Sequence, residues 1–538
     1  MKATITLITI VMFLIITQAF SQPAEEWVAR YDSGGADQLY DMTVDTAGNV
    51  YATGASVQVP FTSDYLTIKY NSSGVKQWEK VYNGIAGSDD RAYAIAVDIP
   101  GNVYVTGGTA YDNSIVTIKY SSLGDTLWVR SYTGPASGHN WTFAKSIFVD
   151  DSGYVYIAGT SEGLTGVHGL FQDYTTIKYS PFGEQLWVAR YNGPGTDADV
   201  VNSMTVDALG NVYVTGYSGG GSTGSSDSYN DITTIKYNPL GDTLWKKTFI
   251  GPGTSPDEGS KITLDDAGNV YVTGTTYIDT SAYENIITIK YSSGGTQLWE
   301  KFFNGTGSNT DEGVDLTVDA MHNVYVTGKS YYGGSNGLDI ITIKYDSTGT
   351  ELWTRNFNGS SNDNDVSEAI TLDDVGNIYV LGTTVNTTTS EDYQIIKYNS
   401  SGTQLWETRY TNSNGVGNQE YAVSLFVDEG DNIYAAGMSI LDYAIVKYSQ
   451  ITGMEEVLGQ FTVTISPNPS NGNFFIENKK KHHQIHLNIY NIMGSIIYQS
   501  EIINPKSEID LSSQPNGIYF LTFSNTQTRF TTKIVIRH

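Results

Sequence analysis

The chain has 538 residues, more than a single hydrophobic core ordinarily serves, so its length predicts several domains or a repeat array. Its 30 Lys and Arg face 57 Asp and Glu, a formal net charge of −27, and a surface of that sign repels nucleic acid phosphates. Cysteine is absent, which excludes disulfides, cysteine nucleophiles and thiolate metal sites. Abundant Tyr and Gly without sustained helical periodicity predict an all-β protein.

The first 21 residues have the pattern of a secretory signal peptide. Lys2 precedes an apolar run from Ile5 to Ile16, and small residues at Ala19 and Ser21 fit cleavage after Ser21. The run is short for the ~30 Å hydrocarbon core of a bilayer, which favours a cleaved signal over a retained anchor. We expect residues 1–21 to be removed and the protein exported, with no membrane span afterwards.

Residues 22–448 contain one unit repeated eight times, with successive tryptophans 50 to 59 residues apart. Each unit has four strand-length segments: Trp-x-x-x-aromatic, an apolar segment ending in Val-Asp or Leu-Asp, one like Val-Tyr-Val-Thr-Gly, and one like Thr-Ile-Lys-Tyr. Turns of the type Asp-x-x-Gly-Asn join the second and third segments. Four antiparallel strands per unit are typical of a β-propeller blade.

The order of the segments predicts how the ring closes. We place the segment ending in Val-Asp innermost, where space near the axis is tight, and the Trp segment outermost. The Trp27–Tyr31 segment then precedes any blade of its own and can supply the outer strand of the last blade. The sequence therefore predicts an eight-bladed β-propeller closed by its N-terminal strand.

The repeat units, such as the run from Val97 to Gly107 (Val-Asp-Ile-Pro-Gly-Asn-Val-Tyr-Val-Thr-Gly), resemble the SBBP repeat of bacterial secreted proteins. The resemblance covers residues 27 to 448 and implies a propeller without implying an activity. The name of that family refers to seven blades, so a seven-bladed ring is the alternative to the eight that the count of copies gives.

A different pattern follows the repeats. A polar linker, residues 449–460, leads into residues 461–538, where alternating strands and Gly turns predict a small Ig-like β-sandwich. The opening Pro467-Asn468-Pro469, the Gly517-Ile518-Tyr519-Phe520 strand and the basic last strand make this region similar to the type A C-terminal sorting domain of the Bacteroidetes type IX secretion system. The resemblance implies recognition by that secretion machinery and release or attachment at the cell surface. The alternative is an adhesive sandwich that stays on the protein.

Two polar residues recur with the repeat. In seven units an acid stands eight positions before the Val-Asp aspartate, and in the third unit Thr142 takes its place. This repeated acid either caps loop N–H groups or belongs to an acidic ring at the channel mouth. The seven acids are Asp37, Asp90, Asp199, Asp257, Asp311, Asp365 and Glu420. The lysine of Thr-Ile-Lys-Tyr recurs in every unit, which predicts inter-blade ion pairs and not a single catalytic lysine.

Departures from the repeat are better candidates for function. The longest loops lie in the third and fourth units, and the aromatic residues on their face could stack on sugar rings. The candidate binding residues are Trp141, His139, Tyr111, Tyr217 and Tyr229. Alternatively, Trp141 only fills space beside an irregular loop.

No catalytic or phosphate-binding signature occurs, and the Asp-x-x-Gly-Asn turns lack the ligand spacing of a calcium loop. We therefore expect no catalytic residue, no cofactor and no metal site, with Ca²⁺ unsupported by a specific motif. The favoured function is an exported binding or scaffold module for a glycan or a protein. The alternatives are a secreted carbohydrate-active enzyme that uses carboxylates at the channel mouth and a structural adhesin.

Overall fold

A computed structural model describes residues 22–58, 62–84, 87–135, 142–163, 172–194, 198–219, 229–252, 255–278, 283–307, 309–332, 337–386, 391–412, 419–450, 463–478, 485–491, 495–502, 506–524 and 529–538. These residues contain β-strands and no helix, so none of them belongs to a helix that could cross a membrane. The expected signal peptide and most of the linker lie outside them. The described chain divides into two compact units, one of Glu25–Ser449 and one that contains Gln450–His538.

The described residues of the first unit form eight four-stranded antiparallel sheets. Seven sheets take four consecutive strands each: β2 (Asp37–Val44), β3 (Val50–Gln58), β4 (Thr62–Tyr70) and β5 (Lys76–Tyr82); β6 (Asp90–Val97), β7 (Val103–Thr109), β8 (Ser114–Tyr120) and β9 (Thr126–Tyr132); β10 (Phe143–Val149), β11 (Val155–Glu162), β12 (Gln172–Tyr179) and β13 (Gln185–Tyr191); β14 (Val200–Val206), β15 (Val212–Gly219), β16 (Asn230–Tyr237) and β17 (Thr243–Phe249); β18 (Glu258–Leu264), β19 (Val270–Thr276), β20 (Asn285–Tyr291) and β21 (Gln297–Phe303); β22 (Asp311–Val318), β23 (Val324–Ser330), β24 (Asp339–Tyr345) and β25 (Glu351–Phe357); and β26 (Asp365–Leu372), β27 (Ile378–Val385), β28 (Glu391–Tyr398) and β29 (Gln404–Tyr410). The eighth has the order β1-β32-β31-β30, from β1 (Ala24–Tyr31), β32 (Asp442–Ser449), β31 (Ile433–Ser439) and β30 (Glu420–Val427).

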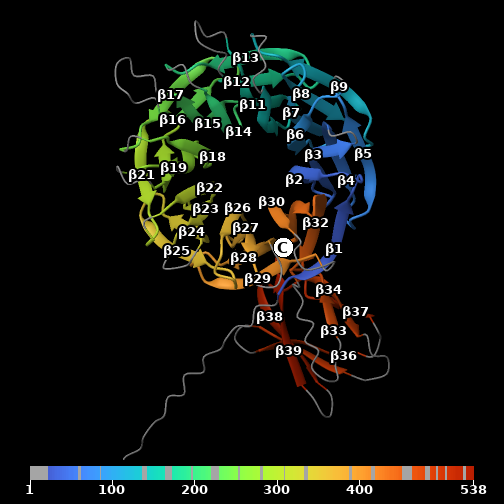
Figure 1. The fold of residues 1–538 in the computed structure, drawn as a ribbon. Helices are drawn as coiled ribbons and strands as arrows, with labels where there is room; N and C mark the ends of the chain where they lie inside the picture. Colours follow the sequence, from blue (N-terminus) through green and yellow to red (C-terminus); the bar gives the residue numbers. More distant parts are fainter. Residues whose placement is uncertain are drawn as a thin grey trace, which may run out of the picture. The chain divides into compact units, whose positions relative to one another are not determined.

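The predicted all-β, propeller-like fold is confirmed. Figure 1 shows the sheets arranged around an axis, with first strands such as β2, β18 and β22 innermost and Trp strands such as β5, β21 and β25 outermost. The strand from the N-terminus, β1, pairs with β32 from the end of the repeat region.

The recurring turn holds the first hairpin of each sheet. In the first sheet, Asp45 Oδ1 accepts hydrogen bonds from the backbone N–H groups of Ala47 (3.0 Å) and Asn49 (2.9 Å), and its Oδ2 accepts from the Tyr51 hydroxyl (2.9 Å). Gly48 takes a φ of +77°, a conformation that favours glycine. The aspartate therefore serves the turn, as the sequence predicts.

The tryptophans connect neighbouring sheets. The Trp78 indole N–H donates to the Ser122 carbonyl (3.2 Å) in the outer turn of the next sheet, and equivalent bonds run from Trp128, Trp187, Trp245, Trp299 and Trp353. Trp27 of β1 makes the same bond to Ser72 of the first sheet (3.1 Å). A Cβ on Gly74 would lie 2.6 Å from the Trp27 ring, so the close approach requires glycine at this turn.

The repeated lysines differ from the prediction. Most of them bind a backbone carbonyl and a tyrosine ring; Lys119, for example, donates to the Pro181 carbonyl of the next sheet (3.2 Å) and lies 4.9 Å from the Tyr104 ring centroid. Of the repeated lysines that the structure describes, Lys397 and Lys447 form ion pairs, with Asp373 (3.4 Å) and Glu26 (2.8 Å). The expectation of eight inter-blade ion pairs is wrong because a tyrosine stands opposite each lysine on the adjacent strand, as Tyr104 does for Lys119.

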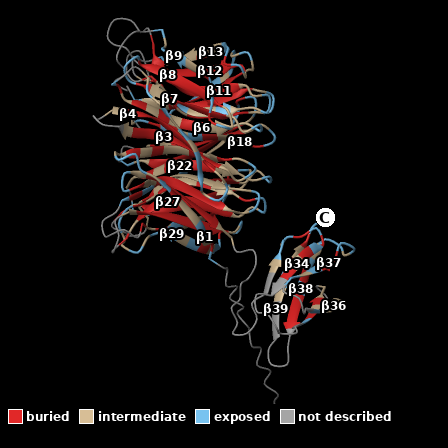
Figure 2. Cartoon of the chain, turned by 90° about the vertical axis from the view of Figure 1, so that its right-hand side faces the viewer, coloured by how far each residue is buried: buried red, intermediate tan, exposed pale blue. Residues whose placement is uncertain are grey.

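The described residues of the second unit form seven strands in two antiparallel sheets. One sheet contains β33 (Val463–Ser466), β34 (Asn473–Asn478) and β37 (Lys506–Asp510), and the other contains β36 (Ile496–Ile502), β35 (Ile485–Tyr490), β38 (Gly517–Ser524) and β39 (Arg529–Ile536). Its core joins both sheets through Phe474, Ile509 and Leu521, and Figure 2 shows that each unit has its own buried interior.

Candidate functional site

The predicted sugar-stacking residues do not gather into a described site. Trp141 and His139 lie outside the described residues. Tyr111 is exposed in the turn between β7 and β8, Tyr217 is half-buried in β15, and Tyr229 is exposed just before β16. The described members thus come from two sheets, and their joint role in binding stays a prediction.

The seven repeated acids are all buried, with exposure of 2% or less. In five of them a carboxylate oxygen accepts a hydrogen bond from the backbone N–H of a glycine six residues earlier, as Asp90 does from Gly84 (2.7 Å) and Asp257 from Gly251 (2.6 Å). Asp37 accepts from the Ser33 N–H (2.7 Å). These are the contacts of a capping carboxylate, and they point the acids into the protein and not toward solvent.

A second repeated acid, at the start of the third strand of a sheet, escaped the sequence reasoning. It faces the capping acid of the next sheet, and we call this place a junction. In the junction between β12 and β14, the Asp199 N–H donates to the Gln172 carbonyl (2.7 Å), and burial, with a smaller contribution from the Asp173 charge, raises the pKa of Asp199. Six junctions pair two acids: Asp442 with Asp37, Asp64 with Asp90, Asp173 with Asp199, Asp231 with Asp257, Asp339 with Asp365, and Asp392 with Glu420.

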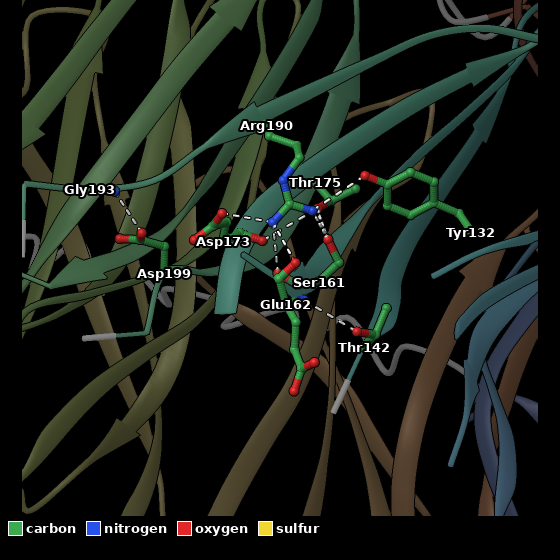
Figure 3. A network of polar contacts seen from close by, with 9 residues as sticks. All are labelled: Tyr132, Thr142, Ser161, Glu162, Asp173, Thr175, Arg190, Gly193 and Asp199. Carbon is green, nitrogen blue, oxygen red and sulfur yellow. Dashed lines mark hydrogen bonds and ion pairs between the residues drawn. The ribbon is translucent and has the colours of Figure 1, made fainter. Parts of the chain in front are cut away.

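Arg190 compensates one junction (Figure 3). Its guanidinium lies 2.7 Å from Asp173 Oδ2 and also donates to the Glu162 carbonyl (2.8 Å). Burial nevertheless raises the pKa of Asp173. Burial, together with the charge of the nearby Asp173, also raises the pKa of Asp199 to about 6. A pair of buried carboxylates therefore remains only partly neutralised.

The remaining junctions show how the acids depend on each other. Where Thr142 replaces the capping acid, the facing residue is Ser114, so both acids are lost together. Asn285 faces Asp311 in the other exception. Both exceptions hold at most one carboxylate, so neither has the repulsion between two buried charges that the other six junctions carry.

The inner strands enclose a cavity of about 340 Å³ that was not predicted. Seven strands, β2, β6, β10, β14, β18, β22 and β26, supply its lining. The lining residues are Tyr40, Asp41, Tyr93, Ala94, Lys145, Ser146, Ile147, Asn202, Ser203, Ser260, Lys261, Val314, Asp315 and Glu368. The polar side chains of this cavity come from seven different sheets.

Polar contacts run around the wall of this central cavity. Lys145 Nζ donates to Asn202 Oδ1 (2.8 Å), and Asn202 Nδ2 donates to Glu258 Oε1 (2.8 Å). Lys261 Nζ lies 3.2 Å from Asp315 Oδ1, while the Lys261 side chain keeps 46% of its surface accessible. The wall is therefore preorganised and still open to a ligand.

An aromatic sector lies beside these polar groups. The ring centroids of Tyr40 and Tyr93 are 5.0 Å apart, and those of Tyr93 and Phe143 are 5.6 Å apart. A smaller cavity of about 150 Å³ adjoins it and shares Tyr93, with Arg91 and Phe143 in its lining. The three rings form a continuous apolar face on the first three sheets.

Burial perturbs the acids of the central cavity. It raises the pKa of Asp41 to about 6 against the opposing effect of the Ile95 backbone N–H, which donates to Asp41 Oδ2 (3.0 Å). It raises the pKa of Glu368 to about 7, and Lys329 only partly offsets this. Glu368 can therefore donate or accept a proton near neutral pH.

Two other clusters have ligand atoms within 4.8 Å of one another, the spacing needed to hold a metal ion: Asp265 with Asp266 and His322, and Asp32 with Asp37 and Asp442. Asp265 already accepts hydrogen bonds from Asn269 and Tyr271 within its turn. Asp37 already caps its loop. Turn and junction contacts account for both clusters.

Comparison with known proteins supplies the family relationships. Residues 464–537 match the secretion system C-terminal sorting domain, and residues 186–222 and 245–279 match the SBBP β-propeller repeat. The chain therefore contains SBBP repeats and a type IX sorting domain. As the resemblance implied, the sorting domain directs this SBBP-repeat protein to the cell surface or the medium.

Other similarities are more distant. An uncharacterized WD repeat-containing protein of Acanthamoeba polyphaga mimivirus is 26% identical over 300 residues, 45% of this chain, and the match spans a fifth of that relative's length. PorZ, a surface component of the Porphyromonas gingivalis type IX secretion system, is 12% identical, with a TM-score of 0.40 over 91% of this chain and 68% of its own. The propeller domain of the Pyrococcus furiosus trilobed protease is 9% identical, with a TM-score of 0.39 over 70% of this chain and 97% of its own.

Proposed function

We propose that this SBBP-repeat protein is an exported, non-enzymatic binding module for a glycan or a protein ligand. Its eight sheets are the eight blades of a ring that β1 closes through its pairing with β32. The sorting domain is read by the type IX secretion machinery during export.

The observation that supports binding is the contrast between repeated and non-repeated polar residues. Repeated groups such as Asp45, Trp78 and Asp90 are engaged in turns, inter-sheet bonds and caps. Non-repeated groups such as Lys145 and Asn202 gather in the central cavity, where the fold does not require them. The aromatic residues that the sequence assigns to the loop face, with Trp141 among them, are the second place for a ligand.

A glycan array probed with the full-length protein tests the binding function. We expect retention of at least one class of glycan by the wild-type protein. Retention of no glycan, together with no binding to outer-membrane protein preparations, would sink the proposal. Export is tested separately by deleting residues 464–537, which should leave the protein in the periplasm while the intact chain reaches the surface or medium.

A secreted carbohydrate-active enzyme is the second candidate. Glu368, with a pKa of about 7, has the property required of a general acid at neutral pH. Hydrolysis of nitrophenyl glycosides that is abolished by Glu368→Gln would favour the enzyme. If none of these glycosides is hydrolysed, the binding function remains the favoured proposal.

A further inference from the structure

Half of the residues that line the central cavity come from one equivalent position in seven of the inner strands. Each of these strands has a register shift that leaves one residue without a partner on the next strand, as between Leu39 and Asp41 and between Ala92 and Ala94. The unpartnered residues are Tyr40, Tyr93, Lys145, Asn202, Ser260, Val314, Glu368 and Val423. All of them except Val423 line the cavity. A β-bulge re-aims a side chain, and here the same bulge aims them toward one space.

The backbone of this position is repeated, but its side chains are not. The capping acid and the turn aspartate are chemically alike in nearly every sheet. The bulge position, in contrast, carries aromatic, cationic, amide, hydroxyl, aliphatic and acidic side chains. The fold therefore needs the bulge and leaves its side chain free to vary. Variation confined to a shared cavity is expected of a site that recognises an asymmetric ligand.

We infer that the central cavity binds a small, neutral, polyhydroxylated ligand of one or two sugar rings. This inference deepens the proposed binding function and rests on it. The volume of about 340 Å³ lies at the lower end of small-molecule sites, which suits a short saccharide or a chain end. Tyr40 and Tyr93 offer the apolar faces on which the C–H face of a sugar stacks.

The polar sector offers both donors and acceptors. Of the three Lys145 N–H groups one is engaged by Asn202, while the Asp315 and Glu368 carboxyl groups accept hydrogen bonds. Sugar hydroxyl groups donate and accept, so they can satisfy both kinds of group at once. The lining holds two lysines, Lys145 and Lys261, against three acids, so neither sign of charge dominates and a neutral ligand is favoured.

Saturation-transfer NMR and calorimetry with the full chain test this site. The probes are glucose, galactose, mannose, N-acetylglucosamine, cellobiose and maltose. We expect at least one to bind, and Tyr93→Ala and Asn202→Leu to weaken it at least tenfold. Phe182→Ala, in the exposed turn between β12 and β13, is the aromatic control and should bind like the wild type. Lys145→Gln changes an exposed side chain and provides a test if Tyr93→Ala does not fold.

The outcomes separate the site from the function. If the folded cavity variants bind the sugar as tightly as the wild type, while Tyr111→Ala or Trp141→Ala loses binding, the central cavity is not the sugar site. The proposed binding function would still stand. Binding of none of these sugars, with retention of a protein partner, would overturn the sugar site alone. No ligand of either kind would overturn both.

Discussion

Removing Arg190 should leave two buried carboxylates facing each other at the junction of β12 and β14. Its guanidinium lies 2.7 Å from Asp173 Oδ2, and the side chains of Arg190 and Asp173 are only 20% and 7% exposed. Arg190→Met keeps most of the aliphatic volume and removes the charge. The variant therefore isolates the electrostatic role of the arginine.

Breaking a buried ion pair by removing one partner costs about 3–5 kcal/mol, because the remaining charge is buried without compensation. Arg190 is partly exposed, and Asp173 can escape the cost by taking up a proton, so we expect about 3 kcal/mol at pH 8. Arg190 lowers the Asp173 pKa, which burial raises. Its loss moves the folded-state pKa further above the unfolded value, so the destabilisation should shrink as pH falls and approach about 1 kcal/mol, the value of the lost hydrogen bonds.

Urea unfolding followed by tryptophan fluorescence at pH 5 and pH 8 measures this effect. The double variant Arg190→Met/Asp173→Asn should recover at least half of the loss at pH 8. A triple variant, Asp173→Ser with Arg190→Ser and Asp199→Thr, copies the neutral junction that the chain already has at Ser114, Ser131 and Thr142. Arg130→Met, which removes bonds to the Phe182 and Gly183 carbonyls without exposing a carboxylate, is the control and should show no pH dependence. A loss below about 1 kcal/mol at pH 8, or equal losses at both pH values, would refute the reasoning.

Three further predictions follow from other parts of the ring. Gly241 has a φ of +90°, and a Cβ there would lie 2.8 Å from the Trp187 ring, so Gly241→Ala should lower the free energy of unfolding by about 2–3 kcal/mol, measured by thermal unfolding. The control Gly376→Ala has a similar φ of +81° but nothing within 4 Å of the added Cβ, and it should cost only about 1 kcal/mol. Equal costs for the two variants would contradict the steric explanation. Burial raises the pKa of Asp365 to about 6, above its unfolded value, so the contribution of Asp365 to stability should decline as pH rises from about 4 to 6. Asp365→Asn should therefore flatten the dependence of the unfolding free energy on pH over that window. An unchanged slope would count against the raised pKa. Glu26→Gln should weaken the bond of β1 to Lys447, 2.8 Å away, and lower the stability by about 1 kcal/mol in 0.05 M salt but less in 0.5 M salt, since the pair is partly exposed; a salt-independent effect would exclude a charge interaction.

Much of the fold follows from local chemistry that a sequence displays. Asp45 and Gly48 specify the turn because their side chain and φ act over a few residues. The Trp segments are recognisable as the outer strands because the same residue recurs with each unit. The prediction of a β1 strand at the end of the last sheet follows from counting segments, and the pairing of β1 with β32 agrees with it.

The central cavity escaped prediction for a physical reason. Tyr40, Asn202 and Glu368 share a role only because the strand register shifts beside each of them, and a register shift leaves no mark in the composition of a strand. The second acid of each junction, such as Asp173, has no fixed spacing from the capping acid of its own sheet, because the loops between them differ in length. It stands 26 residues before the capping acid that it faces in four of the junctions, and this spacing was a signal in the sequence that the reasoning did not use. The tyrosine beneath each lysine was visible in the sequence, but hairpin register was needed to place it there.

Hydrogen exchange of the β1 amides tests most directly whether β1 closes an eight-bladed ring. Exchange is measured on the full-length protein by mass spectrometry, with β32 and β5 as internal references. If β1 closes the ring, amides between Ala24 and Tyr31 should be protected as strongly as those of the other outer strands, including β5. Rapid exchange of β1 with continued protection of β30, β31 and β32 would show an open ring and contradict the account.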